Sequence, residues 1–322
     1  MISDAIAYTA TLLQLNCAVR LSMTTEHQSK QGMLLAISAY TMWGIAPIYF
    51  KAINQVSPLE IVGHRIIWSF LLLSILLHIG RRWRNVRDVT RSKNKMLCLF
   101  STSFLVGINW LIFIWAINNN HMLDASLGYY INPLFNVVLG MLFLGERLRK
   151  LQWFAVILAS IGVVIQLLAF GSIPIVAIAL AATFGVYGLL RKKVSLDAQT
   201  GLFIETLIML PAAAIYLLWI ADSPTANLSH NTLNLNLLLI SAGIVTTLPL
   251  LCFTGAATRL KLSTLGFIQY IGPSLMFLLA VLVYGEDFSQ DKAITFAFIW
   301  SALVIFSYDG LKTQKRSGKT KC

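Results

Sequence analysis

Ionisable side chains inside long apolar stretches are the residues of this sequence with the greatest capacity for chemistry. His64 and Arg65 lie in one such stretch and Glu205 lies in another. An unpaired charge in hydrocarbon is costly, so such residues usually pair with each other or line a pathway. Because Arg65 and Glu205 are equivalent in the internal repeat described below, we expect them to form a structural ion pair. Otherwise, we expect the charged end of the side chain to extend to the nearest membrane interface. A proton-coupling role for Glu205 is the alternative.

Amide, hydroxyl and aromatic side chains in the same kind of stretch could bind an organic solute. Asn132 lies beside Pro133 and Gln269 lies four residues before Pro273. A proline inside a helix removes one backbone hydrogen bond and frees a carbonyl. The alternatives are packing kinks for the prolines and interhelical hydrogen bonds for the amides. The candidate substrate-binding residues are Tyr40, Trp43, Asn109, Trp110, Tyr130, Asn132, Tyr187, Thr247, Gln269 and Tyr270, and the candidate helix breaks are Pro133 and Pro273.

The composition requires that these residues be positioned by membrane-spanning helices. Of the 322 residues, 57% are hydrophobic and 12% are charged, and the mean hydropathy is +0.74, whereas soluble domains carry about 25% charged residues. Ten apolar runs approach the ~20 residues that cross a bilayer as a helix and exceed the ~10 residues of a barrel strand. We therefore predict an all-α integral membrane protein with ten transmembrane helices. The runs lie near 33–50, 59–79, 96–117, 124–144, 151–169, 173–190, 200–220, 236–257, 263–284 and 292–308.

Several classes of function lack their usual signature. The four cysteines are scattered and no CxxC spacing occurs, so we expect neither a disulfide framework nor a metal site. The net charge is +12, but the basic residues lie between the apolar runs and form no motif with aromatic residues. Nucleic acid is therefore not an expected partner. No GxxxxGK[ST] loop is present, which disfavours ATP-driven transport by this chain. We predict that no cofactor is required.

Basic residues concentrate on one side of the predicted helices. Consecutive spans alternate in direction, which assigns each loop to one of two sides. Of the 25 Lys and Arg residues, 22 fall on one side, Lys51 and Lys292 fall on the other, and Arg65 lies within a span. Cytoplasmic loops carry an excess of Lys and Arg. We therefore predict that both termini are cytoplasmic.

Two segments 140 residues apart repeat one pattern. The stretches INPLFNVVLGMLFLGERLRK, residues 131–150, and IGPSLMFLLAVLVYGEDFSQ, residues 271–290, share an Ile, a Pro, two Leu and a Gly-Glu pair without a gap. The offset contains five spans, so the second copy enters the membrane from the opposite side. This inversion explains why Arg147 follows one Gly-Glu pair and Asp287 follows the other. Secondary transporters commonly contain inverted repeats and bind substrate where the halves meet.

Five stretches match one transporter family: SAYTMWGIAPIYFK, SPLEIVGHRIIWS, GINWLIFIWAINN, ASLGYYINPLFNVVLGMLFLGERL and, more weakly, LGFIQYIGPSLMFLLAV. Through them the chain resembles the RarD group of the EamA family, within the drug/metabolite transporter superfamily, from Met33 to Gly310. The resemblance implies two inverted EamA repeats of five spans, a bacterial inner-membrane location and export of small molecules. It also implies a central cavity lined mainly by spans one, three, four, six, eight and nine.

The predicted organisation has four parts: an N-terminal extension at 1–31, a first repeat at 32–170, a second repeat at 171–310 and a basic cytoplasmic tail at 311–322. The first 22 residues are expected to be dispensable, because Met23 would serve equally well as a start.

The function we expect is export of a small organic solute by alternating access. The solute could be a metabolite, an amino-acid-like molecule or a drug such as an amphenicol. An integral-membrane enzyme or a passive channel is the alternative, but the sequence does not gather acids, bases or metal ligands at one depth. The expected partners are the small-molecule substrate and the lipid bilayer, with a homodimer as a possible assembly.

Overall fold

The computed structural model describes residues 28–118, 122–171, 175–225, 228–283 and 290–319. Within these ranges the chain is helical and no strand is found. Nine of the described helices are long and apolar enough to cross a membrane, and a shorter apolar helix covers Gly128–Leu144. The predicted all-α membrane fold, with ten spanning helices in two inverted five-helix repeats, is confirmed.

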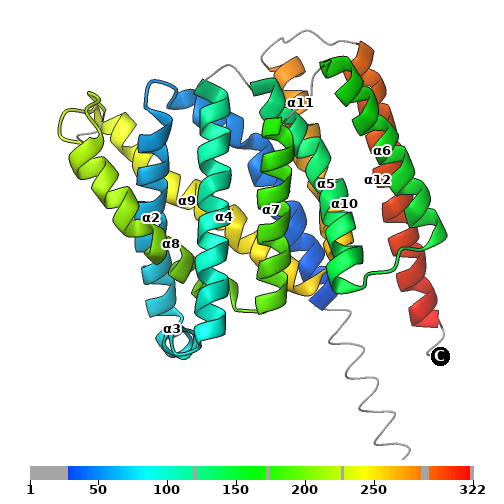
Figure 1. Cartoon of the computed structure of the whole chain (residues 1–322), viewed down its shortest axis with the longest axis horizontal. Coiled ribbons are helices and arrows are strands. Elements are labelled where there is room, and N and C mark those ends of the chain that lie inside the picture. Colours follow the sequence, from blue (N-terminus) through cyan, green and yellow to red (C-terminus); the bar gives the residue numbers. More distant parts are fainter. Residues whose placement is uncertain (1–27, 119–121, 172–174, 226–227, 284–289, 320–322) are drawn as a thin grey trace, which may run out of the picture.

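In the first repeat, five spanning helices alternate in direction and a short helix, α3, joins the second to the third (Figure 1). The sequence did not predict α3. It forms because Val86 and Val89 pack near Leu73 and Leu77 while the arginines of the segment stay exposed. The helices are Gln28–Ala52, called the first helix below, α2 (Pro58–Ile79), α3 (Trp83–Thr90), α4 (Lys93–Asn118), α5 (Met122–Leu144) and α6 (Lys150–Phe170).

The second repeat differs from five simple spans in three places. α8 ends after Pro211 in a π-helical turn, and the ninth span is divided into two helices at Tyr270. α12 extends beyond the predicted span of 292–308, into the segment expected to be a tail. The helices are α7 (Ile175–Val194), α8 (Ala198–Ile215) with its π turn Tyr216–Ile220, α9 (Leu233–Arg259), α10 (Leu262–Gln269), α11 (Ile271–Leu282) and α12 (Gln290–Lys319).

The centre of the bundle is built from both repeats. α5 packs against α7 and α10, and α2 packs against α8 and α9, whereas α6 and α12 form a pair at one edge (Figure 1). Glycines permit the close crossings. A Cβ on Gly266 would lie 2.6 Å from the carbonyl oxygen of Pro133, and one on Gly185 would lie 2.7 Å from the ring of Phe135. These two glycines therefore let α5 approach one helix on each side.

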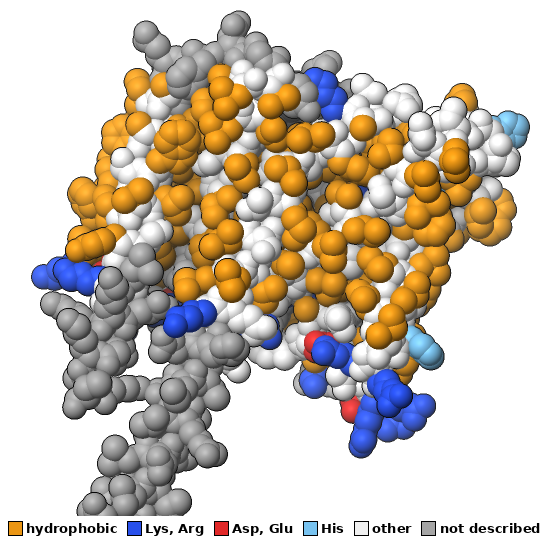
Figure 2. All heavy atoms as spheres, turned by 180° about the vertical axis from the view of Figure 1, so that it is seen from behind, with side chains coloured by type: hydrophobic (Ala, Val, Ile, Leu, Met, Phe, Trp, Pro, Cys, Tyr) orange, Lys and Arg blue, Asp and Glu red, His pale blue; other side chains and the backbone are white. Residues whose placement is uncertain are grey.

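The outer surface matches a bilayer environment. Figure 2 shows apolar side chains over most of one face, with Lys and Arg gathered mainly at the lower end. Among the exposed apolar side chains, Leu142 and Leu168 are 72% and 76% exposed. We call the end of the bundle that carries α3, the turn between α5 and α6, and the end of α12 the basic end.

Candidate functional site

A cavity of about 170 Å³ lies between helices of both repeats. A cavity of about 150 Å³ can hold benzene, so a small organic molecule fits here. All six spans implied by the family resemblance contribute to the lining, and α2 adds Arg65. The lining residues are Tyr40, Trp43, Ala46, Pro47, Phe50, Arg65, Asn109, Trp110, Phe113, Gly128, Tyr129, Asn132, Leu180, Phe184, Leu250, Gln269, Gly272, Pro273 and Met276.

The structure divides the predicted candidates into two groups. Tyr40, Trp43, Arg65, Asn109, Trp110, Asn132, Gln269 and Pro273 line the cavity. The described lining does not include Tyr130, Pro133, Tyr187, Thr247, Tyr270, His64 or Glu205. Sequence reasoning missed Phe50, Phe113 and Met276, because an apolar residue in an apolar span gives no signal that distinguishes a cavity from a lipid contact.

Arg65 is held in the cavity by neutral groups. Its Nε donates a hydrogen bond to Thr246 Oγ1 at 2.7 Å. Its guanidinium carbon lies 4.5 Å from the ring centre of Trp110 and 5.9 Å from that of Phe50, distances typical of cation–π contacts. The ion pairs found in the described part of the chain do not include Arg65.

The predicted pairing of Arg65 with Glu205 is not observed, because Glu205 has a different partner. Arg191 Nη1 lies 3.6 Å from Glu205 Oε1, and both side chains are 1% exposed. Thr102 Oγ1 donates to the same carboxylate at 2.6 Å, and the Tyr187 hydroxyl donates at 3.4 Å. The predicted span of 173–190 stopped one residue before Arg191, whereas α7 continues to Val194 and keeps this arginine buried.

The Arg191 guanidinium fits against a glycine on α8. A Cβ on Gly201 would lie 1.9 Å from Arg191 Nη1, so a larger residue there would force the guanidinium away from its observed position. The buried pair therefore joins α7 to α8 near the basic end and takes no part in the cavity.

Three carboxamides connect the repeats beside the cavity. Asn136 Nδ2 donates to Asn132 Oδ1 at 3.2 Å and to Gln269 Oε1 at 3.1 Å. Asn132 and Asn136 are one turn apart on α5, and Gln269 is the last residue of α10. Asn132 and Gln269, whose oxygens accept these hydrogen bonds, both line the cavity. Their amide NH₂ groups are therefore placed to donate to a solute.

Only one of the two candidate prolines coincides with a helix break. The break between α10 and α11 falls at Tyr270, three residues before Pro273. α5 is continuous through Pro133, contrary to the prediction. Membrane helices tolerate proline, and the Tyr270 hydroxyl donates at 3.3 Å to the carbonyl of Tyr130, next to the Tyr129 carbonyl that loses its backbone donor at Pro133. Tyr130 and Tyr270 thus support the helix crossing beside the cavity.

Asn109 combines both roles considered for it. It lines the cavity, and its Nδ2 donates to the Leu180 carbonyl at 3.0 Å and to Thr183 Oγ1 at 2.8 Å. Thr247 Oγ1 and His64 Nε2 are buried without a hydrogen-bond partner in the described part of the chain. Among the described residues, no group of three or more His, Cys, Asp and Glu could hold a metal ion.

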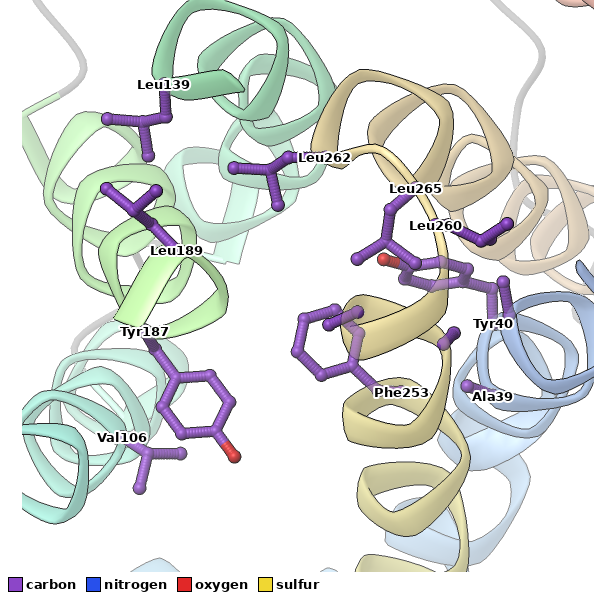
Figure 3. Packing of buried hydrophobic residues seen from close by; sticks show 13 residues of the cluster. Ala39, Tyr40, Val106, Leu139, Tyr187, Leu189, Phe253, Leu260, Leu262 and Leu265 are labelled. Carbon is purple, nitrogen blue, oxygen red and sulfur yellow. The ribbon is translucent and has the colours of Figure 1, made fainter. Parts of the chain in front are cut away.

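Buried apolar side chains close the cavity toward the basic end. On α7, which runs toward that end, the lining residues Leu180 and Phe184 precede the buried Tyr187. On α9, Leu250 likewise precedes Phe253. The rings of Tyr187 and Phe253 stack with centres 6.1 Å apart, and Figure 3 shows these side chains reaching inward from their two helices. We call Tyr40, Leu139, Tyr187, Phe253, Leu262 and Leu265 the closing cluster.

Glu146 caps the first turn of α10 at the basic end. Its carboxylate accepts hydrogen bonds from the Leu262 and Ser263 backbone N–H groups at 2.6 and 3.0 Å, and from Ser263 Oγ at 2.6 Å. The first N–H groups of a helix have no partner within the helix, and a carboxylate satisfies them well. Gly145, which precedes Glu146, has a φ of 63°, a conformation that favours glycine. The second Gly-Glu pair of the repeat lies outside the described residues.

Lys192 binds the end of α9, on the other side of the turn that joins α9 to α10. Its Nζ donates to the carbonyls of Ala257, at 3.3 Å, and Leu260, which lie at the C-terminal end of α9. A cation at this end also interacts favourably with the helix dipole. We call Glu146 and Lys192 the α9–α10 clamp, because one residue holds the end of α9 and the other holds the start of α10.

Comparison with known proteins agrees with this architecture. The sequence profile of the EamA-like transporter family matches the chain twice, over residues 30–168 and 172–308. A Vibrio cholerae protein described as an uncharacterized transporter is 75% identical over 90% of this chain and 96% of its own. Protein RarD of Escherichia coli K12 is 59% identical over 91% of this chain and 99% of its own.

More distant relatives extend the likeness. A Pseudomonas aeruginosa protein named chloramphenicol-sensitive protein RarD is 31% identical over 90% of this chain and 99% of its own. One solved crystal structure superposes with a TM-score of 0.65 at 17% identity, covering 86% of this chain and 97% of that one. At that identity the likeness is one of fold alone.

Proposed function

The chain belongs to the RarD group of the EamA-like transporter family, and from that premise we propose that it exports a small organic solute across the bacterial inner membrane by alternating access. The substrate site is the cavity between the two repeats. Relatives that carry the RarD name in Salmonella typhimurium and Escherichia coli support a bacterial membrane as its location.

The observation that carries the proposal is a cavity lined from both repeats and closed at one end by residues of both repeats. Secondary transporters bind substrate where the repeats meet and move one repeat against the other. The closing cluster contains Tyr40 and Leu139 from the first repeat and Tyr187 and Phe253 from the second. Relative motion of the repeats would therefore separate these side chains and open the cavity toward the basic end.

The excess of Lys and Arg at the basic end supports a cytoplasmic orientation of that end. In that orientation both termini are cytoplasmic, and the closing cluster and the α9–α10 clamp form the cytoplasmic gate. Glu146 and Lys192 release the turn between α9 and α10 when this gate opens. Solute then enters from the cytoplasm and leaves after the gate has closed.

Aromatic faces and amide groups in the cavity suit an organic solute. Trp43 and Trp110 supply ring faces, and Asn132 and Gln269 supply hydrogen-bond donors. The name of the Pseudomonas relative brings amphenicols into consideration, and amino-acid-like metabolites have the same mixture of polar and apolar groups. The proposed partners are this solute and the bilayer, and a homodimer stays a prediction.

Counterflow into proteoliposomes tests the proposal. Vesicles loaded with an unlabelled solute are diluted into labelled solute, using amino acids, amines, organic acids and chloramphenicol in turn. We expect transient accumulation of at least one labelled solute, because an alternating-access carrier exchanges it, whereas a passive channel only equilibrates it. A folded, reconstituted protein that gives no accumulation above protein-free vesicles with any of these solutes would contradict the proposal.

A further inference from the structure

We infer that the transported solute is an organic anion and that Arg65 binds its acidic group, a carboxylate or another group of like charge. The inference rests on the proposed transport function, because it assigns a chemical class to the solute of the same cavity. Of the described residues that line the cavity, Arg65 alone carries a charge.

The geometry around Arg65 leaves the two terminal nitrogens of its guanidinium available to a ligand. Nε is occupied by Thr246 Oγ1 at 2.7 Å, and the guanidinium carbon lies over the Trp110 ring, 4.5 Å from its centre. Neither contact uses the two terminal nitrogens. A guanidinium that is fixed through its Nε and through its contact with a ring can present the terminal N–H groups as a planar fork, which matches the two oxygens of a carboxylate.

The three glutamates that the structure describes are engaged away from Arg65. Glu205 faces Arg191 at 3.6 Å, Glu60 accepts a hydrogen bond from Thr225 Oγ1 at 2.7 Å, and Glu146 caps α10 at the basic end. A cation in the low-dielectric interior of a bundle is costly without a counter-charge. An anionic solute would supply that counter-charge at the moment it binds.

The remainder of the cavity defines the rest of the solute. Trp43, Phe113 and Phe184 offer ring surfaces, and Asn132 and Gln269 offer amide donors. Those groups suit an apolar or aromatic body that carries one acidic group. A cell interior that is electrically negative also favours the outward movement of an anion.

Binding of matched acids, amides and amines to the purified wild-type protein in detergent tests the inference. The probes are phenylacetate, indole-3-acetate and hexanoate, each compared by calorimetry with its own neutral amide and its corresponding amine. We expect at least one acid to bind about tenfold or more tightly than its amide, the range of a charge-assisted hydrogen bond, and its amine to bind most weakly. If no acid binds more tightly than its own amide and amine, including the case in which no probe binds, the inference is overturned.

Variants of Arg65 provide the second comparison. Arg65→Gln should abolish the preference for the acid, and Arg65→Lys should retain part of it, because the positive charge remains while the planar fork is lost. Arg84→Gln is the matched control, since Arg84 is exposed on α3; it should bind every probe as the wild type does. An unchanged acid preference in Arg65→Gln would contradict the role of Arg65. If that variant does not fold, the wild-type comparison of acid with amide still decides.

The two proposals fail in different ways. Preferential binding of acids without counterflow of any solute would support the anion site and contradict export. Counterflow confined to neutral or cationic solutes would support transport and overturn the anion site.

Discussion

At the scale of the residue, two buried arginines perform different tasks. Arg191 is 1% exposed and lies 3.6 Å from Glu205, so its charge is balanced within the protein. Arg65 contacts Thr246 and Trp110 at the cavity and is not balanced by a described carboxylate. The first arginine therefore contributes to the fold, and the second contributes to the lining of the cavity.

Removing one partner of the buried pair should be more harmful than removing both. Glu205→Gln leaves the Arg191 charge unpaired, which for a buried pair costs about 3–5 kcal/mol, whereas loss of both charges can be nearly neutral. We expect a lower midpoint of thermal unfolding for Glu205→Gln and recovery in the double variant Arg191→Gln, Glu205→Gln. Arg65→Gln combined with Glu205→Gln is the control and should give additive losses. Additive losses for Arg191 with Glu205 would show that the pair is not coupled.

Inverted symmetry explains why the repeat alignment suggested the wrong ion pair. Arg65 and Glu205 each lie seven residues after the first residue of α2 and α8, or about 10 Å along a helix. α2 begins at the end opposite the basic end, and α8 begins at the basic end (Figure 1). Equivalent residues of inverted repeats therefore lie at mirrored depths, and only those near the middle of the membrane can meet, as Tyr130 and Tyr270 do where the Tyr270 hydroxyl donates to the Tyr130 carbonyl.

At the scale of the element, the turn between α9 and α10 connects the cavity to the basic end. α10 carries Leu262 and Leu265 of the closing cluster and ends at Gln269 in the cavity lining. Its first turn is capped by Glu146 from the other repeat. Movement of α10 therefore changes the cap, the closing cluster and the cavity together.

Loss of the Glu146 cap should loosen the start of α10. Removing a capping acceptor costs about 0.5–2 kcal/mol, so in Glu146→Ala the amides of Leu262 and Ser263 should exchange with solvent deuterons roughly 2- to 30-fold faster. Hydrogen exchange followed by mass spectrometry measures this difference. Glu60→Ala is the matched control, because Glu60 binds Thr225 in the described structure and lies far from α10 in the fold. Unchanged exchange at both amides in Glu146→Ala would show that the cap is not needed.

The helices could be predicted from the sequence, but the direction in which each side chain points could not. Length and apolar composition identify ten spans. In a soluble helix the polar face marks the orientation, whereas these helices are apolar toward both lipid and neighbouring helices. Of the aromatic and polar candidates, Trp43 and Trp110 line the cavity, while Tyr187 and Thr247, chosen by the same reasoning, lie outside its lining.

At the scale of the whole molecule, the two repeats share one cavity and one closed end. The inverted repeat was visible in the sequence because the Gly-Glu segments align without a gap. The closure at the basic end was not visible, because the cluster joins Tyr40, Tyr187 and Phe253 from three helices distant in sequence. The proposed function makes one central claim, which is that this cavity opens in turn to each side of the membrane.

The rate at which a cysteine in the cavity reacts with a membrane-impermeant maleimide from each side tests that claim most directly. Ala46→Cys, in a protein whose native cysteines have been replaced, places a small reactive group in the lining and leaves the proposed binding residues intact. The reagent is applied to intact cells and, separately, to inside-out membrane vesicles. Alternating access predicts reaction from both sides, with a transported solute slowing both reactions. Reaction from one side only, in a protein that still catalyses counterflow, would contradict it.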